Sequence, residues 1–229
     1  AGPDTGKSVG IIGGGPAGLA AAHELRRLGH RCTIYEMRRS LGGLNVTGVA
    51  PYKMRADAAL SEVESVLGIG GIEVRTSTTV GEHVSLAELE KNHDAVFVGV
   101  GLGTDSALGV PGENLKGVCG AVEWIERFKT GKVALDGVRR CVIVGGGNTA
   151  IDAVREARGF GIESVTMVYR GSEEGMSGYA HEWHAAKGEG VAAAWRSLPV
   201  AFEGEGRVSR VRCVRSEEHT SELQSLTNL

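Results

Sequence analysis

Short apolar runs alternate along this chain with longer stretches in which apolar residues recur at helical spacing. The runs predict β-strands, and the periodic stretches predict helices that bury one face. In the first half the predicted strands are Val9–Ile12, Cys32–Glu36, Ile72–Arg75 and a run from Asp94 into the glycine-rich turn 99–103, and the predicted helices are Pro16–Leu28, Asp57–Leu67 and Val84–Leu89. The unbroken apolar run after Asp94 is typical of a parallel strand buried on both faces.

The same order of elements returns in the second half. Its predicted elements are a helix Ala121–Lys129, a strand Cys141–Val144, a helix Thr149–Arg158, a strand Ser164–Tyr169, and a hairpin of Val200–Phe202 and Arg207–Val214 around Gly204. Strands that alternate with helices indicate an α/β fold with parallel sheets. The repeat indicates two Rossmann-like dinucleotide-binding domains.

A Gly-x-Gly-x-x-Gly motif, made by Gly13, Gly15 and Gly18, joins the first strand to the first helix. Gly13 allows the tight turn, Gly15 lets the backbone approach a pyrophosphate, and Gly18 lets the helix pack closely on the strand. Pro16 and Ala17 begin the helix, where proline is tolerated because the N–H that it lacks would be unpaired anyway. The phosphates then bind at the free N–H groups and positive dipole end of this helix.

A second motif, Gly-x-Gly-x-x-Ala, joins the next strand of this kind to its helix. It contains Gly145 and Gly147, and Asn148 and Thr149 stand at the start of the helix. Two copies of the motif in one short chain are more specific than either alone. They predict two dinucleotides held by two similar domains.

The residues that end the second strand of each copy carry opposite charges. Glu36 lies about 20 residues beyond the first glycines, where an acidic side chain binds the ribose hydroxyls of a dinucleotide. Arg170 is predicted to take the same place in the second copy, where a guanidinium binds a 2′-phosphate that a carboxylate would repel. The alternatives are an ordinary surface glutamate after a glycine-rich turn and an ordinary surface arginine.

Charge and composition exclude several classes of partner. A net charge of −3 and a pI near 6.2 leave no basic footprint for nucleic acid. No apolar stretch reaches the roughly 18 to 20 residues of a membrane helix, and residues 1–7 lack the apolar core of a signal peptide.

The four cysteines are scattered and form no Cys-x-x-Cys pair; they are Cys32, Cys119, Cys141 and Cys213. We expect them to be small core residues in a reducing cytoplasm. The pattern excludes a redox-active dithiol and an iron–sulfur ligand cluster in this stretch. The sequence His181-Glu182-Trp183-His184 is one residue short of a zinc-binding His-Glu-x-x-His motif, so we expect a solvated helix face and no metal site.

With both motifs placed, the chain resembles the two-dinucleotide-binding flavoproteins, and among them the glutamate synthase small subunits and the NADPH-binding part of dihydropyrimidine dehydrogenase. The resemblance spans about residues 8–215 and rests on GGGPAGLAAAHELRRLGH, IYE, LGGLNVTGVAPYKM, DAVFVGVG, GVPGENLKGV, VIVGGGNTAIDA and SVTMVYR. It implies an FAD domain over residues 1–115 and an inserted NAD(P)H domain over residues 116–214. NADPH is the implied second dinucleotide, with NADH as the alternative.

The resemblance also implies roles for further residues. Gly43, Leu44 and Gly101 would lie along the flavin. Hydride would pass from the nicotinamide to the flavin, and electrons would leave singly through iron–sulfur clusters in a preceding cysteine-rich domain or in a large catalytic subunit.

Three departures qualify what the resemblance implies. Few residues precede the first strand, so we expect the cluster domain to be missing here. Tyr169-Arg170-Gly171 replaces the Tyr-Arg-Arg of these proteins, which weakens the case for NADPH. These proteins also continue beyond this point, so we expect both domains to be incomplete at the C-terminal end and the chain alone to be inactive.

Residues 215–229 read like the translation of a common sequencing adapter, and we expect a non-native tail without function; the alternative is an amphipathic tail. The leading interpretation is the central part of an NADPH-dependent FAD oxidoreductase. The alternatives are a flavin disulfide reductase relative, which would need the dithiol that the chain lacks, and a nucleotide-binding fragment without catalysis. The sequence assigns no catalytic residue and no electron acceptor.

Overall fold

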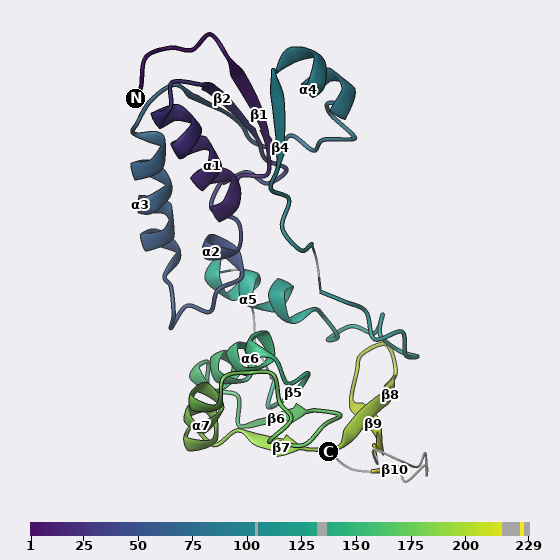
Figure 1. The fold of residues 1–229 in the computed structure, drawn as a ribbon. Coiled ribbons are helices and arrows are strands. Elements are labelled where there is room, and N and C mark those ends of the chain that lie inside the picture. The colour runs from purple at the N-terminus through teal and green to yellow at the C-terminus, as the bar shows by residue number, and fades with distance from the viewer. Residues whose placement is uncertain (104, 132–136, 217–224, 227–229) are drawn as a thin grey trace. The chain divides into compact units, whose positions relative to one another are not determined.

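The computed structural model describes residues 1–103, 105–131, 137–216 and 225–226. The chain divides into two compact units, unit 1 (Ala1–Gly103) and unit 2 (Thr104–Leu229), and each is built on a parallel sheet (Figure 1). The boundary predicted between the two cofactors, at residues 115 and 116, remains a prediction. No helix in the described ranges is both long and apolar enough to cross a membrane.

Unit 1 contains a four-stranded parallel sheet in the order β3-β2-β1-β4. Its strands are β1 (Ser8–Ile12), β2 (Arg31–Tyr35), β3 (Ile72–Arg75) and β4 (Ala95–Val98), and its helices are α1 (Pro16–Arg27), α2 (Leu44–Thr47), α3 (Ala56–Leu67) and α4 (Leu86–Asn92). β1 is paired on both sides, because Val9 lies beside Cys32 of β2 and beside Ala95 of β4. The carboxyl end of β1, where the first glycine motif begins, is therefore in the middle of the sheet.

Helices α1 and α3 lie side by side and pack on one face of this sheet (Figure 1). The side chains buried between these helices and the sheet form one cluster, made of Val9, Ile11, Leu19, Ala22, Cys32, Ile34, Leu41 and Val63. Each aliphatic side chain buried in this way contributes roughly 1.5–3 kcal/mol. This core fixes β1 and α1 on either side of the glycine motif.

β4 differs from its prediction. It runs parallel to β1 as expected, but Val98 is 62% exposed and Leu102, beyond the strand, is 100% exposed. The prediction of a strand buried on both faces is therefore wrong for the part of the chain that the structure describes. The reason is position: β4 is an edge strand, and none of its side chains belongs to the core cluster of unit 1.

Unit 2 contains a parallel sheet in the order β5-β6-β7 and an antiparallel sheet in the order β10-β9-β8. Its elements are α5 (Ala121–Lys129), β5 (Arg140–Val144), α6 (Asn148–Gly159), β6 (Ser164–Val168), α7 (Ala180–Gly188), β7 (Ala192–Ala194), β8 (Ser197–Glu203), β9 (Arg210–Arg215) and β10 (Ser225–Leu226). The hairpin is confirmed as β8 and β9. Residues 217–224 and 227–229 of the predicted tail lie outside the described residues.

The core of unit 2 packs α6 and α7 onto the parallel sheet. Its buried residues are Ile143, Ala150, Ile151, Ala153, Val154, Ala157, Ile162, Val165, Met167, Trp183, Ala186 and Val191. Trp183 is only 3% exposed, whereas His181 and His184 on the same helix are exposed. The expectation of a solvated face holds for the two histidines and fails for Trp183. The described residues contain no group of three or more side chains that could hold a metal ion.

Candidate functional site

The first glycine motif forms the turn between β1 and α1. Gly13 has a φ of +99°, which glycine adopts without strain. A Cβ on Gly18 would overlap the carbonyl oxygen of Gly13 and lie 3.1 Å from its carbonyl carbon. Only a glycine therefore lets α1 pack so close to the turn, and this geometry agrees with the turn and packing roles predicted for the two residues.

At Gly15, and at its counterpart Gly147 in unit 2, a side chain would not clash with the protein. A Cβ on Gly15 would meet Gly43 Cα at 3.8 Å, and one on Gly147 would meet Ser177 Oγ at 3.7 Å, and both are ordinary contacts. A glycine at such a position leaves room for a ligand to approach the backbone closely. The space at both positions fits the pyrophosphate of a dinucleotide.

The helices that follow the two motifs begin without capping groups. Neither α1 nor α6 has a side-chain cap or an acidic residue in its first turn, and Pro16 and Ala17 at the start of α1 are exposed. The other described helices of seven or more residues, α3, α4, α5 and α7, all have an acidic residue there. Because helix N-termini attract anions, α1 and α6 are the two that remain available for phosphates.

The second motif repeats the turn with small differences. Gly145 has a φ of +135°, and Ala150 is buried where the first motif has its third glycine. The side chain of Asn148 accepts the N–H of Tyr179 through Oδ1 at 2.9 Å, so it fastens the loop before α7 to the motif. Thr149 is exposed in the first turn of α6.

Glu36 follows β2 and is only 6% exposed. Its Oε2 accepts the N–H of Gly14 at 2.7 Å, and its Oε1 accepts the N–H of Arg38 at 2.7 Å. An ionised carboxylate can accept about four hydrogen bonds, so both oxygens keep capacity for ribose hydroxyls. The structure places Glu36 next to the first motif; its binding of a ribose stays a prediction.

Two of the predicted flavin residues lie near the first motif. A Cβ on Gly43 would lie 2.8 Å from Gly15 Cα, and Gly43 has a φ of +51°. Leu44 follows as the first residue of α2 and is 48% exposed. This apolar side chain, exposed beside a glycine pair, fits contact with a flat ring.

Gly101 is not brought to the motif. It is exposed, and a Cβ there would meet no atom within 4 Å. Gly99 contacts the motif instead, because a Cβ on Gly13 would overlap the carbonyl oxygen of Gly99. Sequence reasoning included Gly99 only as part of a run; the signal that identifies it is its position directly after β4.

The hydrogen bonds around the motifs show which residues of the two units are equivalent. Gly13 donates to the last residue of β2 at 2.8 Å, and Glu36 follows that residue. Gly145 donates to the last residue of β6 at 2.9 Å, and the residue that follows is Tyr169. Tyr169 therefore takes the place of Glu36, and the prediction that Arg170 does so is wrong by one position. The reason is that the predicted strand was one residue too long.

Tyr169 covers the middle glycine of the second motif with its ring. A Cβ on Gly146 would lie 2.6 Å from that ring, and the tyrosine hydroxyl donates to Gly175 O at 3.2 Å. Arg170, the next residue, is exposed and has no hydrogen bond or ion pair with the described residues. Its guanidinium is available to an anion at the carboxyl end of the sheet.

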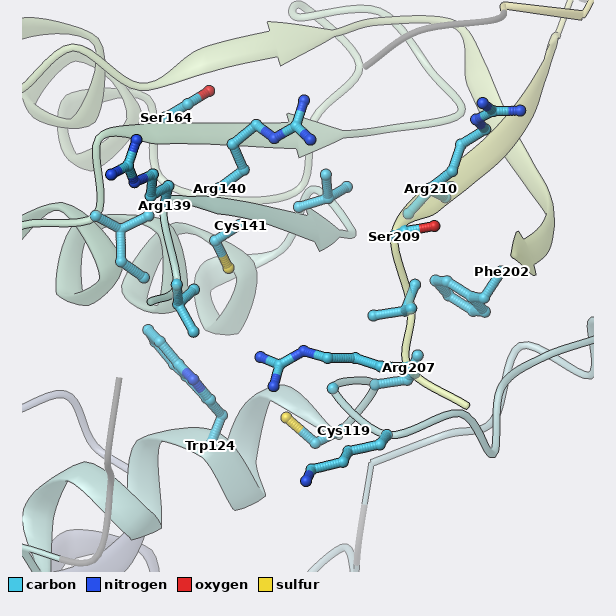
Figure 2. Close-up of a pocket in the computed structure, with 18 of the residues that line it drawn as sticks. Cys119, Trp124, Arg139, Arg140, Cys141, Ser164, Phe202, Arg207, Ser209 and Arg210 are labelled. Carbon is cyan, nitrogen blue, oxygen red and sulfur yellow. The ribbon is translucent and has the colours of Figure 1, made fainter. Parts of the chain in front are cut away.

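Unit 2 also contains a cavity of about 810 Å³. Figure 2 shows Arg140 and Ser164, the first residues of β5 and β6, on its wall. The nucleotide motif follows the other ends of these strands, so this cavity is not the predicted nucleotide site. Its cationic lining consists of Lys116, Arg127, Arg139, Arg140, Arg207 and Arg210.

Two of the four free cysteines, Cys32 and Cys213, are buried as expected. Cys119 is exposed, so the core prediction is wrong there; this residue lies in a loop before α5 and lines the cavity (Figure 2). Burial, with a smaller contribution from the Cys119 thiol, raises the pKa of Cys141 to about 11. Because the thiolate is the nucleophile, a raised pKa disfavours the reactive form of Cys141 at neutral pH.

Comparisons with known proteins agree with this geometry. The profile of the pyridine nucleotide-disulphide oxidoreductase family matches residues 7–226. The small chain of glutamate synthase [NADPH] from Escherichia coli (strain K12) is 36% identical over 226 residues, which cover 93% of this chain and 48% of the relative. The beta subunit of the NADP(+)-dependent formate dehydrogenase of Moorella thermoacetica is 34% identical over 215 residues, covering 92% of this chain and 30% of the relative.

Among solved structures, Mycobacterium tuberculosis FprA in complex with NADPH has a TM-score of 0.76 at 20% identity, over 96% of this chain and 66% of FprA. At that identity the likeness shows the fold: an α/β protein with Rossmann-like parallel sheets. The chain spans about half or less of the two curated relatives that it matches.

Proposed function

This chain belongs to the pyridine nucleotide-disulphide oxidoreductase family, and from that premise we propose that it is the nucleotide-binding part of an NADPH-dependent flavin oxidoreductase. In this proposal residues 1–115 bind FAD and residues 116–214 bind NADPH. Bound FAD would accept a hydride from NADPH. The names of the two curated relatives, a glutamate synthase [NADPH] chain and an NADP(+)-dependent formate dehydrogenase subunit, support this cofactor choice.

One observation carries the proposal. In each unit, one helix begins without a capping side chain and without an acidic residue in its first turn. The glycine before that helix could carry a Cβ without clashing with the protein. A single case could be a feature of the fold alone. Two cases, at equivalent positions of two parallel sheets, are what two pyrophosphates require.

Named residues would hold FAD in unit 1. The N–H groups of Ala17 and Gly18 would bind the pyrophosphate, because they belong to the first turn of α1 and have no capping partner. Glu36 accepts the ribose hydroxyls, and Leu44 contacts the ring system. Bound FAD would supply a two-electron acceptor that can release its electrons singly.

NADPH would be held in unit 2 by equivalent groups. Gly147 leaves space for the pyrophosphate, and the N–H groups of Asn148 and Thr149 bind it at the start of α6. Arg170 binds the 2′-phosphate, because a guanidinium forms two parallel hydrogen bonds with phosphate oxygens.

We further propose that the electrons leave to iron–sulfur clusters of another domain or to a large catalytic subunit. Both curated relatives are named as chains of larger enzymes, which supports a partner subunit. The four free cysteines fit a reducing cytoplasm. They do not favour a flavin disulfide reductase, because none of them is paired in a Cys-x-x-Cys motif.

The test is a spectrum of the purified intact protein. We expect bound flavin, and we expect NADPH to bleach it in the absence of oxygen, faster than NADH does. A colourless protein that binds no added FAD would remove the proposal. A yellow protein that NADPH does not bleach would favour the alternative of a nucleotide-binding protein without catalysis.

A further inference from the structure

Two arginines lie at neighbouring strand ends in unit 2. The last register pair of β6 and β7 is Val168 with Ala194. Arg170 stands two residues beyond the first of these, and Arg196 stands two residues beyond the second. The carboxyl ends of these parallel strands therefore carry one cation each on the same edge of the sheet.

The backbone holds Arg196 beside the chain that carries Arg170. The N–H of Arg196 donates to Gly171 O at 2.9 Å, and the N–H of Ser197 donates to Tyr169 O at 2.9 Å. Arg196 also has a φ of +51°, a conformation that is rare for a residue with a side chain and that gathers at functional sites. The fold thus keeps a strained, exposed arginine at this edge.

The guanidinium of Arg196 interacts electrostatically with the turn after β6. The carboxylate of Glu174 in that turn has a lowered pKa, first because it accepts a hydrogen bond from its own backbone N–H, then because of Ser172, and also because of the nearby Arg196 guanidinium. Glu174 is exposed, so water screens this attraction and a phosphate dianion can compete for the guanidinium.

The position after Arg170 supplies no second cation in this chain, because it is Gly171. A Cβ on Gly171 would lie 2.8 Å from the ring of Tyr169, and that ring is fixed over Gly146. A side chain at position 171 would displace the ring that covers the motif. The neighbouring strand can supply a cation without disturbing it.

We infer that Arg196 binds the 2′-phosphate of the nicotinamide dinucleotide together with Arg170, so that the two guanidiniums hold the phosphate from adjacent strands. This inference rests on the proposed function, which places NADPH in unit 2. Each guanidinium presents a planar pair of donors that matches two phosphate oxygens. An unphosphorylated ribose offers neither arginine a charged partner, so the pair acts on the choice between NADPH and NADH.

The test compares NADP⁺ and NAD⁺ binding to the intact protein by calorimetry at low salt. The main variant is Arg196→Gly, because glycine suits a φ of +51° and removes the guanidinium without adding strain. We expect it to weaken NADP⁺ binding about tenfold or more, the effect of one charge-assisted hydrogen bond, and to leave NAD⁺ binding unchanged. Arg196→Lys should recover part of the loss.

Arg140→Gln is the matched control. It removes one exposed arginine at the amino end of β5, so it changes the net charge equally and should leave both affinities unchanged. The inference would be overturned if Arg196→Gly changed the affinities for NADP⁺ and NAD⁺ equally, or changed neither, in a protein in which Arg170→Gln weakens NADP⁺ binding. A wild-type protein with no preference for NADP⁺ would instead overturn the NADPH part of the proposed function.

Discussion

The two glycine motifs have the same backbone turn, but different side chains cover them. In unit 1 the carboxylate of Glu36 accepts the N–H of Gly14 at 2.7 Å. In unit 2 the ring of Tyr169 packs over Gly146 at the equivalent place, and the charged residue comes one position later as Arg170. In the proposed function the backbone turn would bind a pyrophosphate in both units. The residues that follow the second strand, Glu36 in unit 1 and Arg170 in unit 2, would then contact the ribose end of the dinucleotide.

A second likeness lies after the third strand of each sheet. Ser77 and Arg196 have φ values of +52° and +51°, and each donates its N–H to the chain that follows the second strand, at 2.8 Å and 2.9 Å. The backbone connection is the same, but the side chain changes from a small hydroxyl to a guanidinium. The side chain at this position therefore differs between the units while the backbone stays the same.

The largest effect should come from the contact between α1 and its turn. Gly18→Ala places a Cβ against the carbonyl oxygen of Gly13, and overpacking of this kind costs about 3 kcal/mol or more where backbone must move. We expect unit 1 to lose both stability and FAD. Denaturant unfolding with bound flavin as a second signal measures this. An unchanged midpoint would show that the turn can yield, and that the glycine is not needed for packing.

Glu36→Gln tests the buried carboxylate. One amide nitrogen must then face the N–H of Gly14 or Arg38, so the loss of a charge-assisted hydrogen bond should destabilise unit 1 by about 1.5–3 kcal/mol. Glu24→Gln on the exposed side of α1 is the control and should cost less than about 1 kcal/mol. Tyr169→Phe, at the equivalent place in unit 2, removes a neutral hydrogen bond and should cost about 0.5–1.5 kcal/mol. A larger loss of unfolding free energy for Tyr169→Phe than for Glu36→Gln would contradict the expectation that the charged covering residue stabilises its unit more than the neutral one.

Gly15→Ala and Gly147→Ala separate binding from folding. Neither Cβ would meet an atom closer than 3.7 Å, so both variants should unfold at the wild-type denaturant concentration. We expect the first to lose FAD affinity and the second to lose NADPH affinity, each at least about tenfold, which is about 1.4 kcal/mol. Titration with each dinucleotide checks this. If either variant lost the other unit's cofactor, the assignment of cofactors to units would be wrong.

The smallest effect concerns pH and unit 1. The Nε2 of His93 lies 3.0 Å from the Tyr35 hydroxyl, and its Nδ1 is buried without a partner among the described residues. Burial is the main cause that lowers the pKa of His93; Arg75 lowers it further, and Glu73 and Asp94 act in the opposite direction. A lowered pKa means that the unfolded state binds the proton more readily. Stability should therefore fall as pH drops below about 6.5, the ordinary histidine value.

Hydrogen exchange of β1 amides on both sides of about pH 6.5, corrected for intrinsic rates, measures this effect. His93→Phe should remove the acid sensitivity of unit 1. The β5 amides provide the internal comparison. The His93 ring packs on Gly10 of β1, and the equivalent residue of β5 is Val142. Equal acid sensitivity in β1 and β5 would contradict a role for His93.

The sequence predicted the motifs well because their signals are local. An apolar run, a glycine turn and a helical repeat specify β1 with α1 and β5 with α6 from neighbouring residues alone. β7 consists of three alanines, a residue type that is depleted in strands, so the sequence does not predict it. Its strand structure comes from pairing with β6.

The predictions that are wrong in the candidate site have a different cause. Composition does not mark where β6 ends, so Arg170 was assigned to a position that Tyr169 occupies. The burial of β4 depends on what packs against it, and periodicity does not report that. The contact of Gly99 with Gly13 and the position of Arg196 beside Gly171 both depend on strand pairing between distant parts of the chain. Tertiary neighbours of this kind are absent from any short window of sequence.

The cap of α5 has a practical consequence for dividing the gene. The carboxylate of Asp105 accepts the N–H of Val122 at 3.1 Å, and Pro111 O accepts the N–H of Phe202 in β8 at 2.8 Å. Residues 105–115 therefore belong to the folded body of the second unit, although they precede the boundary predicted between the cofactors. A gene divided before codon 104 keeps both connections. One divided at codon 116 removes a helix cap, which costs about 1 kcal/mol, together with a hydrogen bond to a core strand, and should yield less folded material.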